Sequence, residues 1–409
     1  MAAMRRINQD DLRNHNLSVV LSTMLGSTQP MSRADLAKST GLTKATMSLL
    51  VSMLLERGIL REGVPVVQSV YGRPSTPLIV NGGVMCGIGI QVNTDGYGYV
   101  VLDLDGSVVA ERWLGEDLPD ADADEIFGQL DAMLTEQERT LRDAGYAIAG
   151  TGLALPGLVT EDGHLIMARN LGWEDLDLDS FELVRRLDVV AGNESNMAAI
   201  AQLPGYATQR RDEGLVAPAG SFLYVSTDIG IGGAIVRGGS VISGDHGFAG
   251  EVGHISVQMD GPLCVCGRHG CVEAYAGRRS MVERAGIAEG VEATRPQAGA
   301  ELARRYAEGE ARAVRVVEEA KDAMVSMLVS AINIADVDTV VIGGGWGRVS
   351  SATIGQMRDR VQDQILARNK LHVRLETTGG QGRPSLAGAA ETGLRRFVDD
   401  PLPYLNAGE

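Results

Sequence analysis

The chain has 409 residues, of which 44% are hydrophobic and 22% are charged, with 52 glycines and 13 prolines. This composition excludes wholesale disorder, collagen-like repeats and low-complexity sequence, and at roughly 100–200 residues per domain the length predicts about two to four domains. No apolar run approaches the ~18 residues of a membrane-spanning helix, and no signal-peptide core follows the first residues, so we expect a cytoplasmic protein without a membrane partner.

The formal net charge of −16 is unevenly distributed along the chain. Residues 1–80 contain nine Lys and Arg against five Asp and Glu, a balance of +4, which leaves −20 on the other 329 residues. The net charge argues against a protein that coats nucleic acid. A small basic segment before a large acidic one nevertheless indicates different partners for the two parts.

The basic segment is predicted to fold as a winged helix-turn-helix over residues 1–80. Apolar residues recur at three- and four-residue spacing over 17–25 and over 47–55, which is typical of amphipathic helices. Between these stretches, Ser32 is placed to cap a short helix that ends at Gly41. This short helix, the glycine turn and the helix that follows make a helix-turn-helix.

The predicted DNA-binding surface combines the second helix of this motif with a wing. The polar face of the helix offers hydroxyls and a cation to phosphates and base edges, and we expect DNA contacts from Thr43, Lys44, Thr46 and Ser48. Alternating residues over 59–70 predict a two-stranded wing, which leads into a rigid turn that presents Arg73. An arginine held in this way fits a narrow minor groove, whose negative potential attracts it. The alternative is a helical interaction module with a solvated polar face.

The acidic remainder alternates predicted strands, glycine turns and helices. Strands are expected at 86–92, 97–104, 150–155, 189–191, 221–227 and 339–342. Helices are expected from Met197 and from about Leu386. Glycine turns after strands, in alternation with helices, are typical of an α/β protein with two lobes around a cleft.

The most specific segment of the chain spans residues 228–277. It contains Asp-Ile-Gly-Ile-Gly-Gly-Ala from Asp228, Gly-Glu-Val-Gly-His up to His254, and Cys-x-Cys-Gly-x-x-Gly-Cys-Val-Glu up to Glu273. On these motifs the chain resembles transcription regulators of the ROK family, which also contains sugar kinases, and the resemblance covers nearly the whole length. It implies an α/β protein in which a winged helix-turn-helix precedes a two-lobed actin-like, hexokinase-type fold.

The resemblance also implies a division of the chain. We expect residues 1–80 to form the DNA-binding domain and residues 81–200 the small lobe, which the C-terminal helix at about 388–409 completes. Residues 201–387 are expected to form the large lobe, with the metal loop and a dimerisation surface.

Three of the four cysteines, Cys264, Cys266 and Cys271, lie within eight positions. In a cytosolic chain such clustering indicates a metal site rather than a disulfide scaffold. With His254 upstream as a fourth ligand, the thiolates make a closed Cys3His set that suits zinc, and the family resemblance implies the same four ligands. Because no position is left open for water, we expect a structural zinc ion; the alternative is a set of reduced, buried cysteines.

Carboxylates and amides that exchange hydrogen bonds with neighbouring hydroxyls are the groups that bind a sugar. By resemblance to the family, the predicted sugar contacts are Asn193, Glu194, Glu251, Glu273 and His254, with Asn170 and Gly157 as weaker candidates. Helix capping by Asn193 and a solvated loop position for Glu251 are the alternatives.

The family's kinases carry an Asp-x-Gly-Gly-Thr turn whose backbone cradles ATP phosphates. Here Gln91-Val92-Asn93-Thr94-Asp95 stands at that place, without the glycine pair that lets phosphate approach. Asp95 would repel a phosphate by about 4 kcal/mol at ~4 Å. Glu194 stands where the kinases have their catalytic Asp, one methylene longer, and a ~1 Å misplacement can cost ~100-fold in rate. We therefore expect no kinase activity, and we interpret the glycines at 343–345 as a remnant of the fold.

The leading hypothesis is a sugar-responsive transcription regulator, a repressor of carbohydrate-utilisation genes. Its expected partners are double-stranded operator DNA and a small sugar effector, and an operator with two half-sites requires a homodimer or a dimer of dimers. The alternatives are an active sugar kinase with a DNA-binding head and a regulator whose body binds a protein partner.

Overall fold

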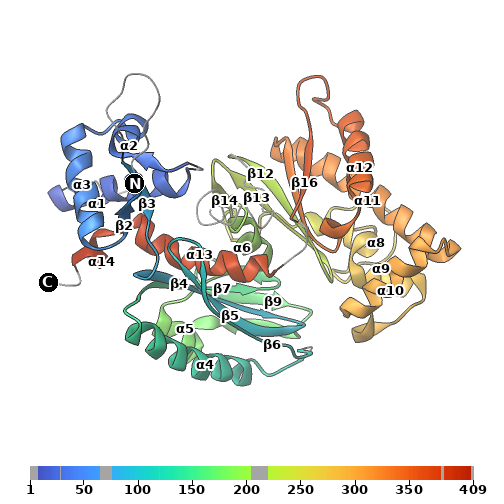
Figure 1. Cartoon of the computed structure of the whole chain (residues 1–409). Coiled ribbons are helices and arrows are strands. Elements are labelled where there is room, and N and C mark those ends of the chain that lie inside the picture. The colour runs from blue at the N-terminus through green and yellow to red at the C-terminus, as the bar shows by residue number, and fades with distance from the viewer. Residues whose placement is uncertain are drawn as a thin grey trace.

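The structure, a computed structural model, describes residues 8–27, 29–64, 76–118, 120–203, 220–378 and 382–406. Figure 1 shows a small helical head at one end, a first lobe beside it and a second lobe beyond. The α/β architecture predicted from the sequence is confirmed, with two five-stranded sheets, one in each lobe. None of the helices in the described ranges is long and apolar enough to cross a membrane.

The head is a winged helix-turn-helix, and its elements are α1 (Gln9–Leu25), β1 (Met31–Ser32), α2 (Arg33–Thr40), α3 (Lys44–Glu56), β2 (Leu60–Glu62) and β3 (Pro77–Val80). The predicted caps are confirmed: Ser32 forms a capping box at the start of α2, and the Thr43 side chain accepts a hydrogen bond from the Thr46 amide. Gly41 ends α2 in the left-handed conformation that glycine adopts without strain.

The wing differs from its prediction. Its first strand, β2, lies within the predicted stretch of 59–70, but the returning strand is β3 at 77–80, where Leu60 pairs with Val80. The reason is burial: Leu78 and Val80 both point into the core, so the alternating pattern that completes the wing comes later in the chain. Arg73 and the predicted turn around it lie outside the described residues.

The first lobe is built on a sheet with strand order β11-β7-β4-β5-β6. Its elements are β4 (Met85–Asn93), β5 (Gly96–Asp103), β6 (Val108–Leu114), α4 (Ala123–Asp143), β7 (Ala147–Leu155), β8 (Leu158–Val159), β9 (His164–Ala168), β10 (Trp173–Asp177), α5 (Glu182–Leu187), β11 (Val190–Asn193) and α6 (Glu194–Ile200), with a short 3-10 turn at Leu178–Ser180. Helix α6 begins at Glu194, three residues earlier than predicted, because the Asn193 side chain caps it.

The second lobe is built on a sheet with strand order β14-β13-β12-β15-β16. Its strands are β12 (Phe222–Thr227), β13 (Ile231–Arg237), β14 (Ser240–Ile242), β15 (Thr339–Gly344) and β16 (Arg374–Thr377). Its helices are α8 (Glu273–Ala276), α9 (Arg278–Ala285), α10 (Pro296–Ala307), α11 (Ala311–Ala335) and α12 (Ser351–Gln364), with 3-10 turns at Val252–His254, Gly290–Thr294 and Trp346–Arg348.

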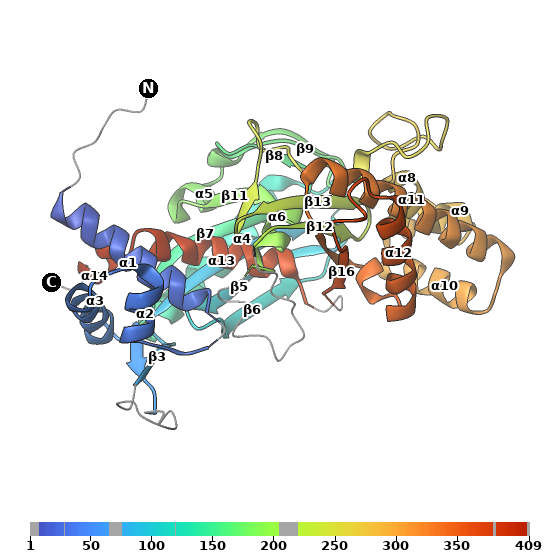
Figure 2. The same ribbon diagram turned by 90° about the horizontal axis from the view of Figure 1, so that it is seen from above.

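The chain then returns to the first lobe through α13 (Pro384–Asp399) and α14 (Leu402–Asn406). Figure 2 shows α13 as a straight rod that runs from the region between the two sheets to the head. Along its length α13 packs on β4, β7 and α6. Gly388 allows the closest of these approaches, because a Cβ there would lie 1.7 Å from the Met197 carbonyl oxygen of α6.

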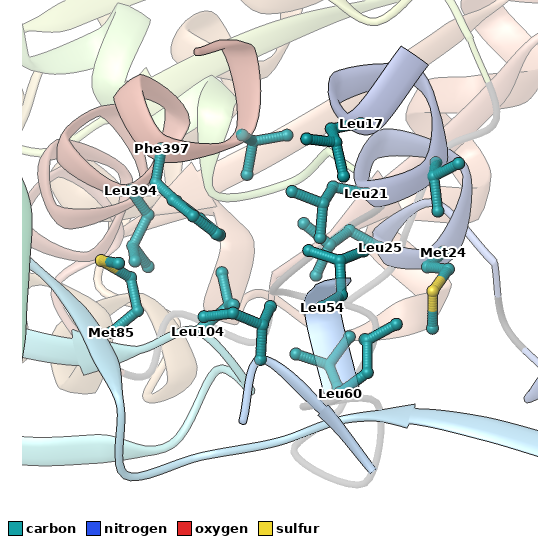
Figure 3. Close-up of a cluster of buried hydrophobic side chains, with 14 of the residues drawn as sticks. Leu17, Leu21, Met24, Leu25, Leu54, Leu60, Met85, Leu104, Leu394 and Phe397 are labelled. Atoms are coloured by element: carbon teal, nitrogen blue, oxygen red, sulfur yellow. The ribbon is translucent and has the colours of Figure 1, made fainter. Parts of the chain in front are cut away.

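The head and the first lobe share one hydrophobic core. Buried residues of the head, including Leu17, Leu21 and Leu54, pack in the same cluster as Met85 of the sheet and Phe397 of α13 (Figure 3). Packing does not stop at the predicted boundary near residue 80, so the head is not joined to the body by a linker alone.

Candidate functional site

A cavity of about 300 Å³ lies between the two lobes. Its lining includes all seven predicted sugar contacts: Gly157, Asn170, Asn193, Glu194, Glu251, His254 and Glu273. The first four come from the first lobe and the last three from the second, so neither lobe contains the complete set. Residues that are far apart in the sequence are thereby brought to one polar cavity.

The wall from the first lobe is formed where two neighbouring parallel strands end. β7 and β11 pair in register, with Leu155 opposite Asn193, so the turn after β7 and the start of α6 meet at the same edge of the sheet. The Asn193 side chain accepts a hydrogen bond from the Ser195 amide at 2.7 Å and donates one to the Gly157 carbonyl at 2.8 Å. Asn193 is therefore a helix cap as well as a cavity residue.

Glu194 carries a carboxylate that its surroundings keep close to protonation. The Asn93 amide donates to the Glu194 carboxylate at 3.1 Å from the end of β4. Burial raises the pKa of Glu194 to about 7, and the nearby charges of Asp228 and Asp95 act in the same direction. A carboxyl group with this pKa exchanges a proton near neutrality and can either accept or donate a hydrogen bond.

The wall from the second lobe presents two further glutamates. Glu273 begins α8 and accepts a hydrogen bond from the Ile231 amide at 2.9 Å. This approach requires glycine at position 230, because a Cβ there would lie 2.3 Å from the Glu273 carboxylate. Burial is the main cause that raises the pKa of Glu251, which faces the His254 ring with 3.9 Å between carboxylate oxygen and Nε2.

The four predicted metal ligands form one compact cluster. The nearest ligand atoms of His254, Cys264, Cys266 and Cys271 all lie within 4.8 Å of one another. The Cys264 sulfur is 3.7 Å from His254 Nδ1, and the sulfurs of Cys266 and Cys271 are also 3.7 Å apart. A disulfide needs ~2.05 Å, whereas ligands on a tetrahedron with metal–sulfur bonds of ~2.3 Å are separated by distances close to those observed.

The chemistry of these side chains also fits a metal cation. Burial raises the pKa of the Cys264 thiol to about 12, so a cation must compensate for the thiolate charge if this sulfur is to be ionised at neutral pH. His254 directs Nδ1 to the sulfurs and Nε2 to Glu251, which is the orientation that a carboxylate neighbour gives a metal-binding histidine.

Several cavity residues were not predicted as site residues. Arg169 donates a hydrogen bond to the Val265 carbonyl at 3.1 Å, and this contact joins the first lobe to the metal loop of the second. Asp228, at the end of β12, also lines the cavity, and burial raises its pKa while Arg278 and Arg348 lower it. The signal in the sequence that could have identified Arg169 is its position directly before Asn170, a predicted sugar contact.

The Gln91–Asp95 segment is held by contacts within the chain. It forms the end of β4 and a tight turn into β5. Asp95 pairs with Arg383 at 3.2 Å, and the Arg383 guanidinium stacks on the Trp113 ring at 3.3 Å from its centroid. Arg383 thus offsets part of the negative charge that the sequence places at this turn.

A second cavity, of about 500 Å³, lies on the other side of Asp228. It is contained in the second lobe, with apolar side chains of α9 and α10, and Gly345 and Trp346 border it after β15. Of the predicted remnant at 343–345, Gly345 lines this cavity, while a Cβ at Gly343 would meet the buried Tyr224 hydroxyl at 2.1 Å. Close packing accounts for the glycine at position 343.

The predicted DNA-binding residues of the helix lie at the start of α3. Thr43, Lys44 and Ser48 are exposed, and Thr46 is partly buried, with its hydroxyl 2.9 Å from that of Thr43. The opposite side of α3 is buried through Met47, Leu50, Val51 and Leu54. The polar side of the helix is therefore available to a partner.

Characterised proteins are similar to this chain in sequence. The profile of the ROK family matches residues 87–393. A xylose repressor of Bacillus subtilis strain 168 is 28% identical over 279 residues, which cover 68% of this chain and 69% of that protein. A relative from Caldicellulosiruptor sp. strain Rt8B.4, provisionally named a xylose repressor, is 28% identical over 405 residues, or 96% of this chain and 98% of its own length.

Sugar kinases and a solved regulator are also similar. An N-acetylmannosamine kinase of Citrobacter koseri is 31% identical over 219 residues, which cover 52% of this chain and 67% of that protein. The crystal structure of a ROK-family transcriptional regulator, a homologue of the Escherichia coli Mlc protein, has a TM-score of 0.74 at 21% identity and covers 96% of this chain and 99% of that one. This likeness shows that the fold, head included, is shared.

Proposed function

The chain belongs to the ROK family, and on that premise we propose that it is a transcriptional repressor that releases its operator when a sugar binds between the lobes. The observation that carries the proposal is the union of two sites in one chain. The head carries an exposed polar face on α3, and a cavity lined by Asn193, Glu194, Glu251 and Glu273 lies between the two lobes. The similarity to xylose repressors supports both halves.

Thermal denaturation in the presence of sugars tests this function directly. A ligand that binds only the folded protein raises its melting temperature. We expect D-xylose, D-glucose or N-acetyl-D-mannosamine to raise the melting temperature, and the same sugar to lower affinity for an operator fragment. If no sugar of a wide panel affected either quantity, the body would have to respond to a protein partner instead.

We propose roles in ligand binding for six of the seven predicted contacts, all except His254. Glu194, Glu251 and Glu273 accept hydrogen bonds from ligand hydroxyls, and Asn170 adds an amide that can both donate and accept. Asn193 acts through its contact with Gly157, which fixes the turn at the cavity wall. The three acids are costly to bury together, so a ligand that satisfies them stabilises the closed arrangement of the lobes.

We propose further that the protein binds its sugar without phosphorylating it. The Gln91–Asp95 turn lacks the glycine pair for close phosphate approach. It is held in place by the ion pair of Asp95 with Arg383, whose guanidinium stacks on the Trp113 ring. Glu194→Asp tests this sharply, because it restores the shorter acid but leaves Asn93, Thr94 and Asp95 unchanged. We expect no ATP-dependent phosphorylation of any panel sugar by this variant; measurable turnover would restore the kinase alternative.

The cation proposed for the His254–Cys271 cluster is zinc, in a structural role. Three thiolates and one imidazole form a closed tetrahedral set, and zinc is the metal that such soft ligands hold without redox chemistry. The ion would stabilise the loop that carries Val265, the partner of Arg169. If one of the four ligands is replaced, we expect the metal content and the sugar affinity to decline together.

We propose that the chain divides into a head of residues 1–80, a small lobe of residues 81–200 completed by the C-terminal helices, and a large lobe of residues 201–387. The signal of sugar binding would pass between these parts. Because the head packs in the core of the small lobe, closure of the lobes moves the head relative to the large lobe. In a homodimer or dimer of dimers held by the large lobes, this changes the separation of two heads on an operator in the cytoplasm.

A further inference from the structure

The end of β4 gives the sugar site a feature that the seven predicted contacts do not include. Asn93 is the last residue of β4, and β4 pairs in parallel with β7, which in turn pairs in parallel with β11. The ends of all three strands therefore meet at one edge of the sheet. From there the Asn93 amide nitrogen reaches the Glu194 carboxylate at 3.1 Å, although 101 residues separate them in the chain.

We infer that Asn93 is a positioning residue for effector binding, which holds the Glu194 carboxylate ionised and oriented toward the ligand. This inference rests on the proposed function. It also changes the interpretation of the Gln91–Asp95 segment, whose loss of the family's glycines had indicated only the loss of a phosphate site. The same residues supply a contact that the sugar site requires.

The orientation of the Asn93 side chain is determined by its neighbour. The amide oxygen of Asn93 accepts hydrogen bonds from the Thr94 backbone nitrogen at 2.7 Å and from the Thr94 hydroxyl at 3.3 Å. A backbone N–H can only donate, so the oxygen must face Thr94 and the NH2 group must face Glu194. Asn93 is thus a fixed donor, and its donor end points at a carboxylate.

Gln91 strengthens the arrangement from the same face of the strand. Residues two apart on a strand point to the same side, and the Gln91 side chain lowers the pKa of Glu194, which favours its ionised form. Gln91 is 4% exposed, and its own amide oxygen has no partner among the described residues. A buried amide that leaves one end unsatisfied is retained at a cost, which indicates a use for the other end.

A hydrogen bond donated to a carboxylate favours its ionised form, so the Asn93 contact acts in the same direction as Gln91 and against the other influences on Glu194. Burial, Asp228 and Asp95 all favour the protonated acid. Tyr224 of β12 lies near enough for the Glu194 charge to affect it, and the cations in the surroundings face the two aspartates: Arg278, Arg348 and Arg383. The ionisation of Glu194 near neutrality therefore depends on its hydrogen bonds from β4.

The test measures Glu194 directly and needs no ligand. Glutamate labelled with 13C at the carboxyl carbon is titrated by NMR, and the Glu194 signal is identified by its absence in Glu194→Gln. Asn93→Ala should raise the apparent pKa of Glu194 by about one unit or more, and Asn93→Asp, which adds a charge, should raise it further. The matched control is Asn333→Ala, an exposed asparagine of α11 that should leave the titration unchanged.

Binding of D-xylose by calorimetry between pH 6 and 9 provides the second measurement. Asn93→Ala should weaken binding about tenfold at pH 7 and much less at pH 9, where Glu194 is ionised in both proteins. In Glu194→Gln the further change Asn93→Ala should have no effect. An unchanged Glu194 titration, or a loss of affinity that is equal at every pH, would overturn the positioning role. If wild-type protein bound no sugar, the proposed function would fail, while the titration would still decide the contact.

Discussion

At the scale of single residues, the ionised Glu194 carboxylate lowers the stability of the fold but is the form proposed to bind the sugar. It begins α6, lies in the cavity and receives an amide hydrogen bond from Asn93, yet burial and two aspartates favour its neutral form. A folded protein keeps such a group at the expense of stability when the group serves a function. Two predictions separate the binding role from the stability cost.

The first prediction concerns the ligand response. Glu194→Gln replaces a charged acceptor by a neutral amide of the same size, and a hydrogen bond to a buried charge contributes ~1.5–3 kcal/mol. Sugar affinity should therefore fall about 10- to 150-fold, while operator affinity without sugar stays at the wild-type value. In cells the expected phenotype is repression that inducer cannot relieve. Normal induction of the variant in a reporter assay would remove Glu194 from the site.

The second prediction concerns the pH dependence of stability. The pKa of Glu194 rises from 4.5 in the unfolded chain to about 7 in the folded protein. The stabilisation from the neutral acid is therefore complete below pH 4.5 and is lost as the pH rises through 7. Glu194→Gln escapes this loss, so it should be more stable than wild type at pH 8, by about 3 kcal/mol at most, and should gain little at pH 4.5.

Melting curves at pH 4.5, 6 and 8 measure this difference. The exposed helical residue Glu136 of α4 provides the matched control, because Glu136→Gln makes the same chemical change without burial. A variant Glu194→Gln whose stability relative to wild type did not change with pH would show that the carboxylate ionises freely in the folded protein.

At the scale of elements, the metal loop joins the two walls of the cavity. His254 belongs both to the Cys3His cluster and to the cavity, and Val265 between two of the cysteines accepts the hydrogen bond from Arg169. A loop with few apolar contacts of its own depends on its metal for a single conformation.

The third prediction tests that dependence. Elemental analysis of freshly purified protein should find about one zinc ion per chain. Cys266→Ser should lower the zinc content, the melting temperature and the sugar affinity together, because the loop that holds His254 and Val265 loosens. Ser240→Ala, at an exposed position of β14 outside the loop, serves as the control. Native protein that contained no metal would contradict the assignment.

The fourth prediction concerns the head. Lys44 is exposed at the first turn of α3, where a cation meets a phosphate in the proposed complex. Lys44→Ala should weaken operator binding at low salt and reduce the slope of log affinity against log salt by about one. Arg73→Ala should also weaken binding, with sugar affinity unchanged in both variants. If both variants bound the operator as wild type does, the winged helix would not be the DNA-binding surface.

At the scale of the whole molecule, α13 and α14 connect the wall of the cavity between the lobes to the head. Helix α6, which begins at Glu194, touches α13 at Gly388, and the other end of α13 packs under α1 through Phe397. Asn14 of α1 then binds both Asp400, at 2.7 Å, and the Leu402 amide, at 2.8 Å. A continuous packed path thus runs from the cavity wall to the head (Figure 2).

The fifth prediction breaks this path at its last contact. Asn14→Ala removes two hydrogen bonds, one to Asp400 at the end of α13 and one from the first residue of α14, but leaves the buried face of α1 intact. Operator affinity without sugar should remain within a few fold, whereas the ratio of affinities with and without sugar should decrease. The matched variant Asp400→Ala removes only one of the bonds and should have a smaller effect. An unchanged ratio in both variants would show that the signal reaches the head by another route.

The sequence by itself determined the elements and the inventory of the site. Helix caps at Ser32 and Thr43, strand patterns and the Cys3His spacing are local, because each depends on residues a few positions apart. They predicted the winged helix, the α/β body and the four residues of the Cys3His cluster. The family resemblance supplied the seven cavity residues, which the structure brings to one place.

Only the tertiary structure decided what those residues face. The contact of Asn93 with Glu194, the pairing of Asp95 with Arg383 and the packing of the head on α13 join segments from about 100 to almost 400 positions apart. No periodicity or cap records such a contact, because it depends on how strands order in a sheet and which helix covers them. For the same reason a turn that the sequence indicates to be a lost phosphate site lies, in the fold, against the Glu194 carboxylate of the proposed sugar site.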